Sequence, residues 1–467
     1  MVSKPIIVWF RQDLRREDNP ALHAAYEQGV HVIPVYILDD VNSGDYKMGG
    51  ASRWWLHQSL NKLNDSLSGH LSVFAGDAAD IIPKIAKSAG AQAVYWNRCY
   101  EPWRTERDKT IKQTLKDDGL DVKSFNGSLL WEPWDTHKDD DTPYKVFTPF
   151  YKKGCLANNG EPPHPISAPE RLTYGDAPKG AVSIDDLGLM PSIKWYDTMD
   201  KEWTPGEDGA MQRLEDFLDQ GLRGYKEGRN FPDKLNVSRL SPHLHYGEIS
   251  PRTVWHKARQ VMIAEHAETD GETFCSELGW REFSNNLLYH FPTLPEEPLQ
   301  EKFNNFEWHK NDEALERWQK GMTGYPIVDA GMRELWATGY MHNRVRMIVG
   351  SFLVKDLLLH WKHGERWFWD TLVDADLANN SASWQWIAGC GADAAPYFRI
   401  FNPVSQGQKF DPEGNYVRRW VPEIASLPDK YLHAPWETDH DCDYPDPIVD
   451  HKQAREEALA LFKAISG

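Results

Sequence analysis

Short apolar runs and longer segments with helical spacing alternate along the first 130 residues. This rhythm predicts an α/β domain with a parallel, Rossmann-like sheet wrapped by helices. The expected strands are residues 6–10, 32–37, 71–74, 93–96 and 122–125, and helices such as 51–67 and 105–116 lie between them. No Gly-x-Gly-x-x-Gly follows the first run, which argues against an ordinary dinucleotide site.

The pattern changes twice further along the chain. Residues 131–205 are rich in Pro, Gly and Asp without regular spacing, which predicts a long linker on the surface of the domains it joins. From residue 206 the apolar positions recur with helical spacing. Clear examples are residues 206–222, 248–262, 313–322 and 344–361. The expected organisation is therefore an α/β domain over 1–130, a linker over 131–205 and an all-α domain over 206–467.

Charge limits the functions open to this chain. It has 467 residues and a formal net charge of −18, which taken alone argues against a nucleic-acid binder. Residues 223–239, however, hold five basic and two acidic residues, and residues 333–366 hold six basic and three acidic residues. An acidic protein can therefore still present a local basic face.

The cysteines and the start of the chain indicate a cellular compartment. Cys99, Cys155, Cys275, Cys390 and Cys442 are odd in number and show no Cys-x-x-Cys or His/Cys metal spacing. This pattern is typical of reduced thiols and predicts no metal site. The chain opens on a strand-like run, and no apolar run approaches the roughly 18 residues of a membrane span. We therefore expect a cytoplasmic protein with no membrane partner.

The densest chemistry lies in residues 370–403, where two acids, an amide and two tryptophans fall within thirteen residues. They are Asp374, Asp376, Asn380, Trp384 and Trp386. In an extended chain, residues two apart face the same way, so the acids would share a side. The tryptophans would likewise share a side or line two walls of one cavity. Such a cluster suits a large, flat, polar-edged ligand such as a flavin or a nucleobase.

Two further segments carry candidate chemistry, each with a purely structural alternative. Glu277, Trp280 and Arg281 share a helix face, and the alternative is a helical Glu–Arg pair beside a core tryptophan. Arg344 and Arg346 lie beside an apolar helix, where arginines are costly to bury unless they are paired or face an anion. The alternative there is a solvated start to a buried helix.

A last segment precedes a helical stretch and is rich in hydroxyl groups. Ser238 and Ser241 flank Arg239 and Leu240, downstream of Tyr225. Hydroxyls and free backbone amides near a helix start suit phosphate binding. The alternative is helix capping alone.

Together these segments resemble the photolyase/cryptochrome family over nearly the whole chain. The matching motifs include VWFRQDLRREDNPAL, SRLSPHLHYGEISPR, ELGWREF, MHNRVRMIVGSFLVKDLL and DADLANNSASWQW. The resemblance implies an N-terminal α/β antenna-binding domain and a C-terminal helical domain that holds FAD folded into a U.

The resemblance also implies roles for the residues at matching positions. The FAD-binding residues would be Tyr225, Val237, Ser238, Arg239, Leu240, Ser241, Arg281, Arg346, Asp374, Asp376 and Asn380. Val237 stands where many relatives have Thr, so only its backbone amide would contribute, and Asn380 would face flavin N5. The relay that carries an electron from the surface to the excited flavin would be Trp308, Trp361 and Trp384. The flipped dimer and the DNA would contact Arg229, Glu277, Trp280, Asn343, Arg344, Met347, Trp386 and Arg399.

Four positions discriminate between members of the family. Asn380 stands where plant-type cryptochromes usually carry Asp, and Trp386 stands where the DASH group usually has Tyr. Asn343 and Met347 delimit a segment in which (6-4) photolyases place histidines. These residues favour a bacterial-type photolyase of class I/III that repairs cyclobutane pyrimidine dimers under blue light, with Glu277 stabilising charge on the dimer. The alternative is a cryptochrome photoreceptor with the same fold and FAD but no repair.

The family resemblance also implies a second, light-harvesting pigment near the N-terminal domain. Methenyltetrahydrofolate is the first choice by analogy with class III, and 8-hydroxy-5-deazaflavin is the second. Arg53, Glu101 and Trp103 are the candidate lining residues. The expected partner is UV-damaged DNA, and the expected state is a monomer with no obligate protein partner.

Overall fold

The computed structural model describes residues 4–394, 398–438 and 443–466. Its N-terminal part is built on a five-stranded parallel sheet with strand order β3-β2-β1-β4-β5. The strands are β1 (Ile6–Phe10), β2 (Val32–Leu38), β3 (Ser72–Ala75), β4 (Ala93–Asn97) and β5 (Asp121–Phe125). The predicted strands are therefore confirmed, and the alternation of short apolar runs with helical segments reflects a wrapped parallel sheet.

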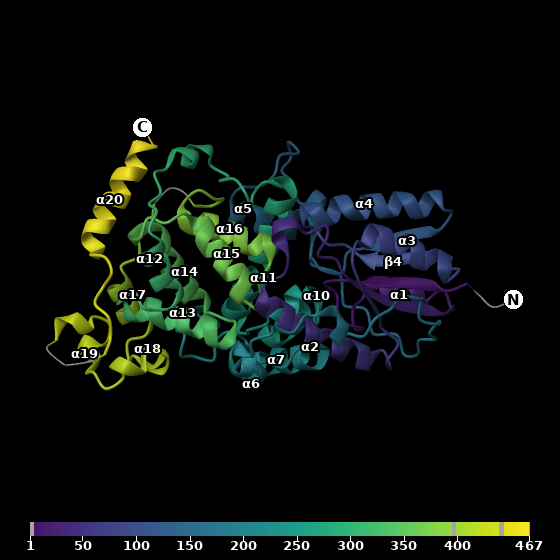
Figure 1. Cartoon of the computed structure of the whole chain (residues 1–467), viewed down its shortest axis with the longest axis horizontal. Helices are drawn as coiled ribbons and strands as arrows, with labels where there is room; N and C mark the ends of the chain where they lie inside the picture. The colour runs from purple at the N-terminus through teal and green to yellow at the C-terminus, as the bar shows by residue number, and fades with distance from the viewer. Residues whose placement is uncertain (1–3, 395–397, 439–442, 467) are drawn as a thin grey trace.

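The central strand β1 supplies side chains to two hydrophobic cores. Ile6, Val8 and Phe10 belong to one cluster, whereas Ile7 and Trp9 belong to the other, as strand alternation requires. The helices of this part are α1 (Pro20–Tyr26), α2 (Gly50–Ser66), α3 (Ala78–Ser88) and α4 (Pro102–Asp117) (Figure 1). From β1 the chain adds β2 and β3 on one side of the sheet, and it then returns to add β4 and β5 on the other side. Open α/β sheets bind ligands beyond the carboxyl ends of the strands at such a switch point, here between β1 and β4.

The segment that follows the sheet is not confined to the surface, as its composition had predicted. Trp131, Tyr144, Phe147, Phe150 and Tyr151 are buried in one cluster with helices of the C-terminal part. These aromatic residues bury large areas, and they outweigh the Pro, Gly and Asp residues between them. The short helical elements here are α5 (Phe147–Pro149), a π-helical run (Phe150–Ala157) and α6 (Met199–Glu202). The domain boundaries near residues 130 and 205 stay a prediction.

The rest of the chain is helical, as predicted. Its helices are α7 (Glu207–Gln220), α8 (Tyr225–Gly228), α9 (Ser241–His245), α10 (Pro251–Ala264), α11 (Glu268–His290), α12 (Asp312–Gln319), α13 (Pro326–Thr338), α14 (Asn343–Ser351), α15 (Trp361–Thr371), α16 (Leu377–Ala388), α17 (Pro403–Phe410), α18 (Asn415–Trp420), α19 (Asp429–Leu432) and α20 (His451–Ala464). The single helix expected over 344–361 is wrong in its second half. After α14 a π-helical turn (Phe352–Asp356) follows, and the chain then breaks with Leu358 at a φ of 54°. Trp361 therefore begins a new helix.

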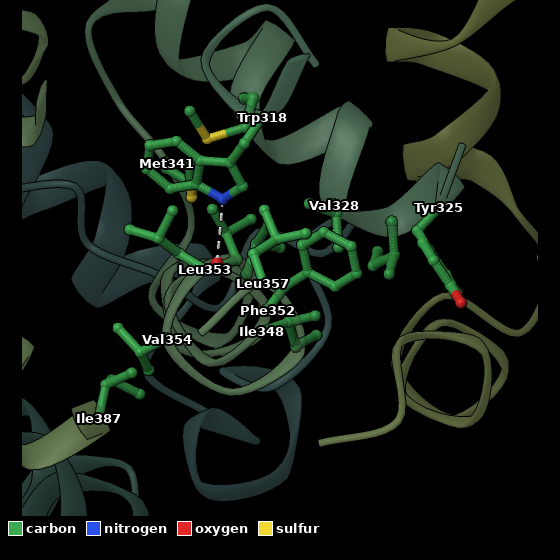
Figure 2. Packing of buried hydrophobic residues seen from close by; sticks show 14 of the residues in the cluster. Trp318, Tyr325, Val328, Met341, Ile348, Phe352, Leu353, Val354, Leu357 and Ile387 are labelled. Carbon is green, nitrogen blue, oxygen red and sulfur yellow. Dashed lines mark hydrogen bonds between the residues drawn. The ribbon is translucent and has the colours of Figure 1, made fainter. Parts of the chain in front are cut away.

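The core of the helical part surrounds the fully buried Trp318. Its indole Nε1 donates to the backbone carbonyl of Val349 at 3.2 Å, which satisfies the one polar atom that the side chain buries. Figure 2 shows Phe352 and Leu353, from the π-helical turn, packed in the same cluster as the indole. This packing fixes the turn, and with it the place where α15 starts.

The sheet and the C-terminal helix α20 lie at opposite ends of the long axis (Figure 1). In the ranges that the structure describes, no helix has both the length and the apolar character needed to cross a bilayer. The same ranges contain no group of three or more His, Cys, Asp or Glu side chains that could hold a metal ion. The cysteines Cys99, Cys155, Cys275 and Cys390 are free and buried, and Cys442 lies outside the described residues.

Candidate functional site

Asp374 is the centre of a polar cluster that joins three separate segments. Its Oδ2 accepts hydrogen bonds from Ser241 Oγ at 2.5 Å and from Arg346 Nη2 at 2.8 Å. Arg346 Nε also donates to the carbonyl of Met341 at 2.7 Å. Burial lowers the pKa of Arg346, but the Asp374 carboxylate more than offsets this and leaves the pKa raised. The structure thus brings together three residues expected to hold FAD.

Asp376 faces the same short helix as Asp374. Its carboxylate caps α16 by accepting from the Asn379 N–H at 2.8 Å, and its Oδ2 lies 3.3 Å from His245 Nδ1. Burial raises the pKa of Asp376, yet the bond to His245 and the cap lower it further, so that the carboxylate is favoured. Ser241 and His245 are the two ends of α9, so both acids contact the same helix, although Asp374 lies in a turn and not in an extended chain.

Asn380 is buried on α16 with its amide orientation fixed. Its Nδ2 donates to the backbone carbonyl of Glu365 at 2.9 Å, so its Oδ1 is the atom left to accept from a ligand. The side chain of Glu365 accepts from Ser381 Oγ, and burial raises the pKa of Glu365 to about 7. This arrangement is compatible with the expected contact to flavin N5.

The segment from Val237 to Ser241 is compact and strained. Arg239 has a φ of 50°, a left-handed conformation that costs energy for a residue with a side chain. Its guanidinium lies over the rings of Trp203, at 4.5 Å, and Tyr340, at 4.8 Å. The Leu240 N–H points at Ser238 Oγ at 3.4 Å. Strain of this kind clusters at ligand sites, in line with the expected phosphate-binding role.

Tyr225 and Arg281, the other expected cofactor residues, lie on α8 and α11. Tyr225 is buried, and burial raises the pKa of its hydroxyl. Arg281 donates to Glu282 at 2.9 Å rather than to Glu277, so the helical pair considered as an alternative is not formed. Glu282 also accepts the N–H of Leu130 at 2.8 Å, and burial raises its pKa to about 7. Glu282 thus ties Arg281 to the start of the linker.

The expected substrate residues of α11 have partners from distant parts of the chain. Glu277 forms an ion pair with Arg229, which was expected to bind phosphate. Trp280 stacks on Phe147, with ring centroids 3.8 Å apart and planes within 9°. One face of the Trp280 indole is therefore covered, which leaves the other face for a base.

Arg344, on α14, has its own protein contacts. It donates to Asn230 Oδ1 at 2.5 Å and lies 4.5 Å from the ring centroid of Phe410. Burial, with the nearby Arg229, lowers the pKa of Arg344. Arg399 is exposed, and its segment lies beside the end of α14, where the Phe401 N–H donates to Ser351 Oγ at 3.3 Å. All three arginines expected to bind phosphate therefore have interactions within the protein: Arg229 with Glu277, Arg344 with Asn230, and Arg399 electrostatically with Asp393.

Asn343, Met347 and Trp386 complete the expected substrate side. Asn343 is exposed, whereas Met347 and Trp386 are partly buried and pack on the largest core cluster. Trp384 and Trp386 both lie on α16, so the prediction that they share a side is wrong, because helical residues two apart point in different directions. Trp384 is buried in the core and Trp386 lies nearer the surface.

The three tryptophans of the expected relay run from the core outward. Trp384 packs against Phe368 with ring centroids 5.0 Å apart, and Trp361 is 1% exposed. Trp308 is partly exposed and contacts Phe306 at a centroid distance of 4.4 Å. Trp384 and Trp361 are thus both buried, and only Trp308 reaches toward the solvent, as the outermost member of an electron path to the surface must.

One cavity lies between the carboxyl ends of β1, β2 and β4 and residues of the helical part, including His245, Ala375 and Leu377. Its lining includes Glu101 and Trp103, two of the antenna candidates, together with Arg11, Arg104 and Arg107. Arg53 is absent from the described lining. It instead donates to Asp40, a lining residue, at 2.5 Å. A second, smaller cavity is lined by Glu101 together with Arg281, His245 and Asp376.

Several polar atoms in these sites are buried without a protein partner in the described ranges. They include Asp374 Oδ1, Arg239 Nε and Glu101 Oε2. Buried polar groups in proteins are nearly always hydrogen-bonded, so unpaired ones indicate a missing ligand. A carboxylate oxygen and a guanidinium nitrogen beside the start of α9 fit FAD, which offers both hydroxyl donors and phosphate acceptors.

Three residues that sequence reasoning missed support the site. They are His245 beside Asp376, Glu365 behind Asn380, and Phe147 against Trp280. His245 lies four residues after Ser241, a spacing that could have placed it on the same helix face. No local signal pointed to Phe147, because it lies far upstream in the presumed surface linker.

Comparisons with known proteins agree with this geometry. Residues 6–170 match the family model described as DNA photolyase, and residues 274–464 match the FAD binding domain of DNA photolyase. The deoxyribodipyrimidine photo-lyase of Agrobacterium fabrum is 49% identical, covering 99% of this chain and 98% of that protein. Cryptochrome-2 of Arabidopsis thaliana is 40% identical, covering 100% of this chain and 79% of that protein.

A solved structure gives the same result. The crystal structure of a bacterial class III photolyase from Agrobacterium tumefaciens superposes with a TM-score of 0.95 at 48% identity, covering 100% of this chain and 98% of that one. Both the sheet and the helical part are included in this match. On this identity over nearly the full length of both proteins, the chain belongs to the photolyase/cryptochrome family.

Proposed function

We propose that this protein repairs cyclobutane pyrimidine dimers in UV-damaged DNA with light as the energy source. The observation that carries the proposal is its 49% identity, over 98% of that protein's length, to a deoxyribodipyrimidine photo-lyase. A dimer must leave the duplex to reach a cofactor held in a protein, and photolyases are among the base-flipping enzymes. A damaged pair costs less to unstack than an intact one, which supplies part of the selectivity.

The cluster around Asp374 would hold FAD. Bound FAD, reduced and excited by blue light, supplies the electron that splits the cyclobutane ring and takes it back, so there is no net redox change. Ser241 and the strained backbone at Arg239 would bind the phosphates. Arg346 and Asp374 would hold opposite charges beside the flavin ring, and Asn380, oriented by the bond from its Nδ2 to the Glu365 carbonyl, would present its Oδ1 to flavin N5.

Residues on α11 and α16 would receive the dimer. These two helices pack against each other, so Trp280 and Trp386 lie on neighbouring elements. Their indoles would form flat walls for the splayed bases, and the stacked Phe147 holds Trp280 in place. Glu277, oriented by Arg229, would accept a hydrogen bond from a pyrimidine edge and stabilise charge on the dimer.

The decisive assay is repair of UV-irradiated oligo-dT by the purified protein. We expect the ultraviolet absorbance of thymine to recover under blue light and not in darkness. Undamaged oligo-dT gives the baseline. Failure to restore absorbance with reduced FAD bound would contradict the proposal.

A cryptochrome photoreceptor is the second candidate, because Cryptochrome-2 of Arabidopsis thaliana is 40% identical to the chain. Asn380 favours repair, since an amide can bond flavin N5 without being an acid. In the oligo-dT assay a photoreceptor would change its own absorption spectrum in light but leave the dimers intact.

The cavity beyond the strand ends would hold the antenna pigment, with methenyltetrahydrofolate preferred over 8-hydroxy-5-deazaflavin. Arg11, Arg104 and Arg107 line this cavity, balanced by Asp39, Asp40 and Glu101, and Trp103 offers an aromatic face. These charged donors and acceptors and the indole would bind the polar edges and the flat ring of either pigment. The absorption spectrum of freshly purified protein, together with the mass of the extracted pigment, distinguishes the two.

We further propose a monomer that works in the cytoplasm, with the antenna domain over residues 1–130. The free, buried cysteines Cys99, Cys155, Cys275 and Cys390 support a reducing compartment. Light scattering of the purified protein tests the oligomeric state. Limited proteolysis between residues 131 and 205 tests the domain boundaries.

A further inference from the structure

His360 lies between two of the relay tryptophans. The ring centroids of His360 and Trp308 are 5.1 Å apart, and those of His360 and Trp361 are 5.4 Å apart with planes inclined by 29°. The aromatic contacts of the described residues include none between Trp308 and Trp361 themselves. The imidazole is therefore the ring that joins the partly exposed indole to the buried one.

The backbone around His360 fixes this geometry. The chain turns sharply at Leu358, which has a φ of 54°, and the His309 N–H donates to the Leu358 carbonyl at 2.8 Å. This bond forms part of a short bridge that pairs His309 with Leu359. In this parallel bridge Trp308 is opposite Leu358 and Lys310 is opposite His360, so the Trp308 and His360 rings meet diagonally across the bridge.

The imidazole of His360 is held in its neutral form. Its Nδ1 accepts the Lys362 N–H at 3.1 Å and so caps α15. Burial, together with the cationic or ionisable His363, Lys362 and Arg366, lowers the pKa of His360 to about 4. A neutral ring adds no positive charge beside a tryptophan that has lost an electron, and it therefore does not oppose that loss.

We propose that His360 is a positioning residue of the tryptophan relay and the medium through which an electron passes from Trp308 to Trp361. In this step one electron leaves the Trp308 indole and returns the oxidised Trp361 indole to its neutral state. A thiol reductant in solution then restores Trp308. His360 is neither oxidised nor reduced. The inference rests on the proposed function, because it needs a light-driven relay in which these two tryptophans take part.

The competing explanation is that His360 only caps α15. Two substitutions separate the roles. His360→Asn keeps a capping side chain but removes the ring, since Asn is a preferred N-cap residue. His360→Phe keeps a ring but loses the cap, which costs about 1 kcal/mol of stability.

The measurement is flash photolysis of the FAD-loaded protein, following the rate at which the Trp308 radical appears, with urea unfolding alongside. We expect the rate in His360→Asn to fall by about an order of magnitude, equal to about 1.4 kcal/mol in the barrier, with unchanged stability. His360→Phe should transfer within about twofold of wild type and unfold more easily. A wild-type rate in His360→Asn, or equally slow rates in both variants, would overturn the role of His360.

A third variant separates failure of this inference from failure of the relay. Trp308→Phe should stop the Trp308 signal and slow light-driven reduction of FAD. Normal reduction in Trp308→Phe would show that electrons take another route, and His360 would then have no relay to serve. If light-driven reduction of FAD were slow in Trp308→Phe while His360→Asn transferred electrons at the wild-type rate, the relay would be supported and His360 would have no part in it.

Discussion

The indole of Trp384 lies directly against Gly364, where an added Cβ would come within 2.0 Å of the ring. Gly364 lies on α15, one turn after Trp361, and Trp384 lies on α16. The absence of a side chain at Gly364 therefore lets the innermost relay tryptophan approach the helix that carries the middle one.

Gly364→Ala should displace the Trp384 indole and slow light-driven reduction of FAD. Overpacking costs about 1–3 kcal/mol, and the better helix propensity of alanine offsets up to about 1 kcal/mol of it. The variant should therefore fold, and it should still repair dimers when FAD is reduced chemically. Gly350→Ala is the matched control, because its Cβ would lie 3.5 Å from the same indole. Equal reduction rates in both variants would contradict the role of the close packing.

Asp374→Asn should weaken FAD retention and the fold together. The substitution leaves the buried end of Arg346 without its carboxylate, and breaking a buried pair costs roughly 3–5 kcal/mol. We expect the low end of that range because the Arg346 side chain is 25% exposed. Thermal unfolding and the FAD content after gel filtration measure both effects. Asp219→Asn changes an exposed aspartate on α7 in the same way and should alter neither.

The fold was largely predictable from the sequence, because strand alternation and helical spacing are local signals. The strands and most helices follow from them. The break after α14 was not predictable, since Leu353 and Leu357 continue the apolar pattern through the π-helical turn. Tertiary packing around Trp318 decides where that pattern stops being helical.

The site was predictable in its residues but not in its contacts. The motif match named Glu277 and Arg229 separately, yet only the structure pairs them. Trp280 was predicted to contact the dimer, and only the structure shows that Phe147 covers one of its faces. Such pairings join segments far apart in the chain, and no periodicity in either segment encodes them. The same holds for His360, whose partner Trp308 is reached through a backbone bridge.

Glu282 should make stability fall as the pH rises. Burial raises its pKa in the folded protein from 4.5 to about 7. Below pH 4.5 the carboxyl is protonated in both states, and as the pH rises toward 7 only the unfolded chain loses the proton, which favours unfolding by up to a few kcal/mol. Glu282→Gln should remove this part of the pH dependence in urea unfolding. Glu301→Gln, at an exposed position, should leave the pH dependence unchanged. If the free energy of unfolding varied with pH equally in the two variants, the assignment to Glu282 would be wrong.

The affinity for DNA should fall with increasing salt concentration, with a small slope because few arginines contact the phosphates. Arg399 is exposed, whereas Arg229 is already paired with Glu277. Arg399→Gln should lower the slope of log affinity against log salt by about one unit. Arg229→Gln should change the slope less, because its charge is partly neutralised within the protein. Affinity for dimer-containing DNA that does not vary with salt would exclude phosphate contacts of this kind.

Trp386 should recognise the lesion without holding FAD. It lies two residues after Trp384 on α16 and is partly exposed, whereas Trp384 is buried, so the two indoles serve different sides of the helix. Stacking of a base on an aromatic ring is worth roughly 1–3 kcal/mol, so Trp386→Ala should weaken binding to dimer-containing DNA by about one to two orders of magnitude. Binding to undamaged DNA rests on phosphates and should barely change.

The decisive comparison for Trp386 is the preference for damaged over undamaged DNA at one salt concentration. Trp336→Ala is the control, since Trp336 is the more exposed tryptophan, at 52%, and lies on α13 outside the proposed dimer site. Trp386→Ala should keep its FAD content and spectrum while losing the preference, and Trp336→Ala should keep both. If Trp386→Ala also lost FAD, the indole would belong to the flavin site. If it kept the full preference, Trp386 would be a packing residue only, and the dimer would have to be recognised by Trp280 and Glu277 on α11.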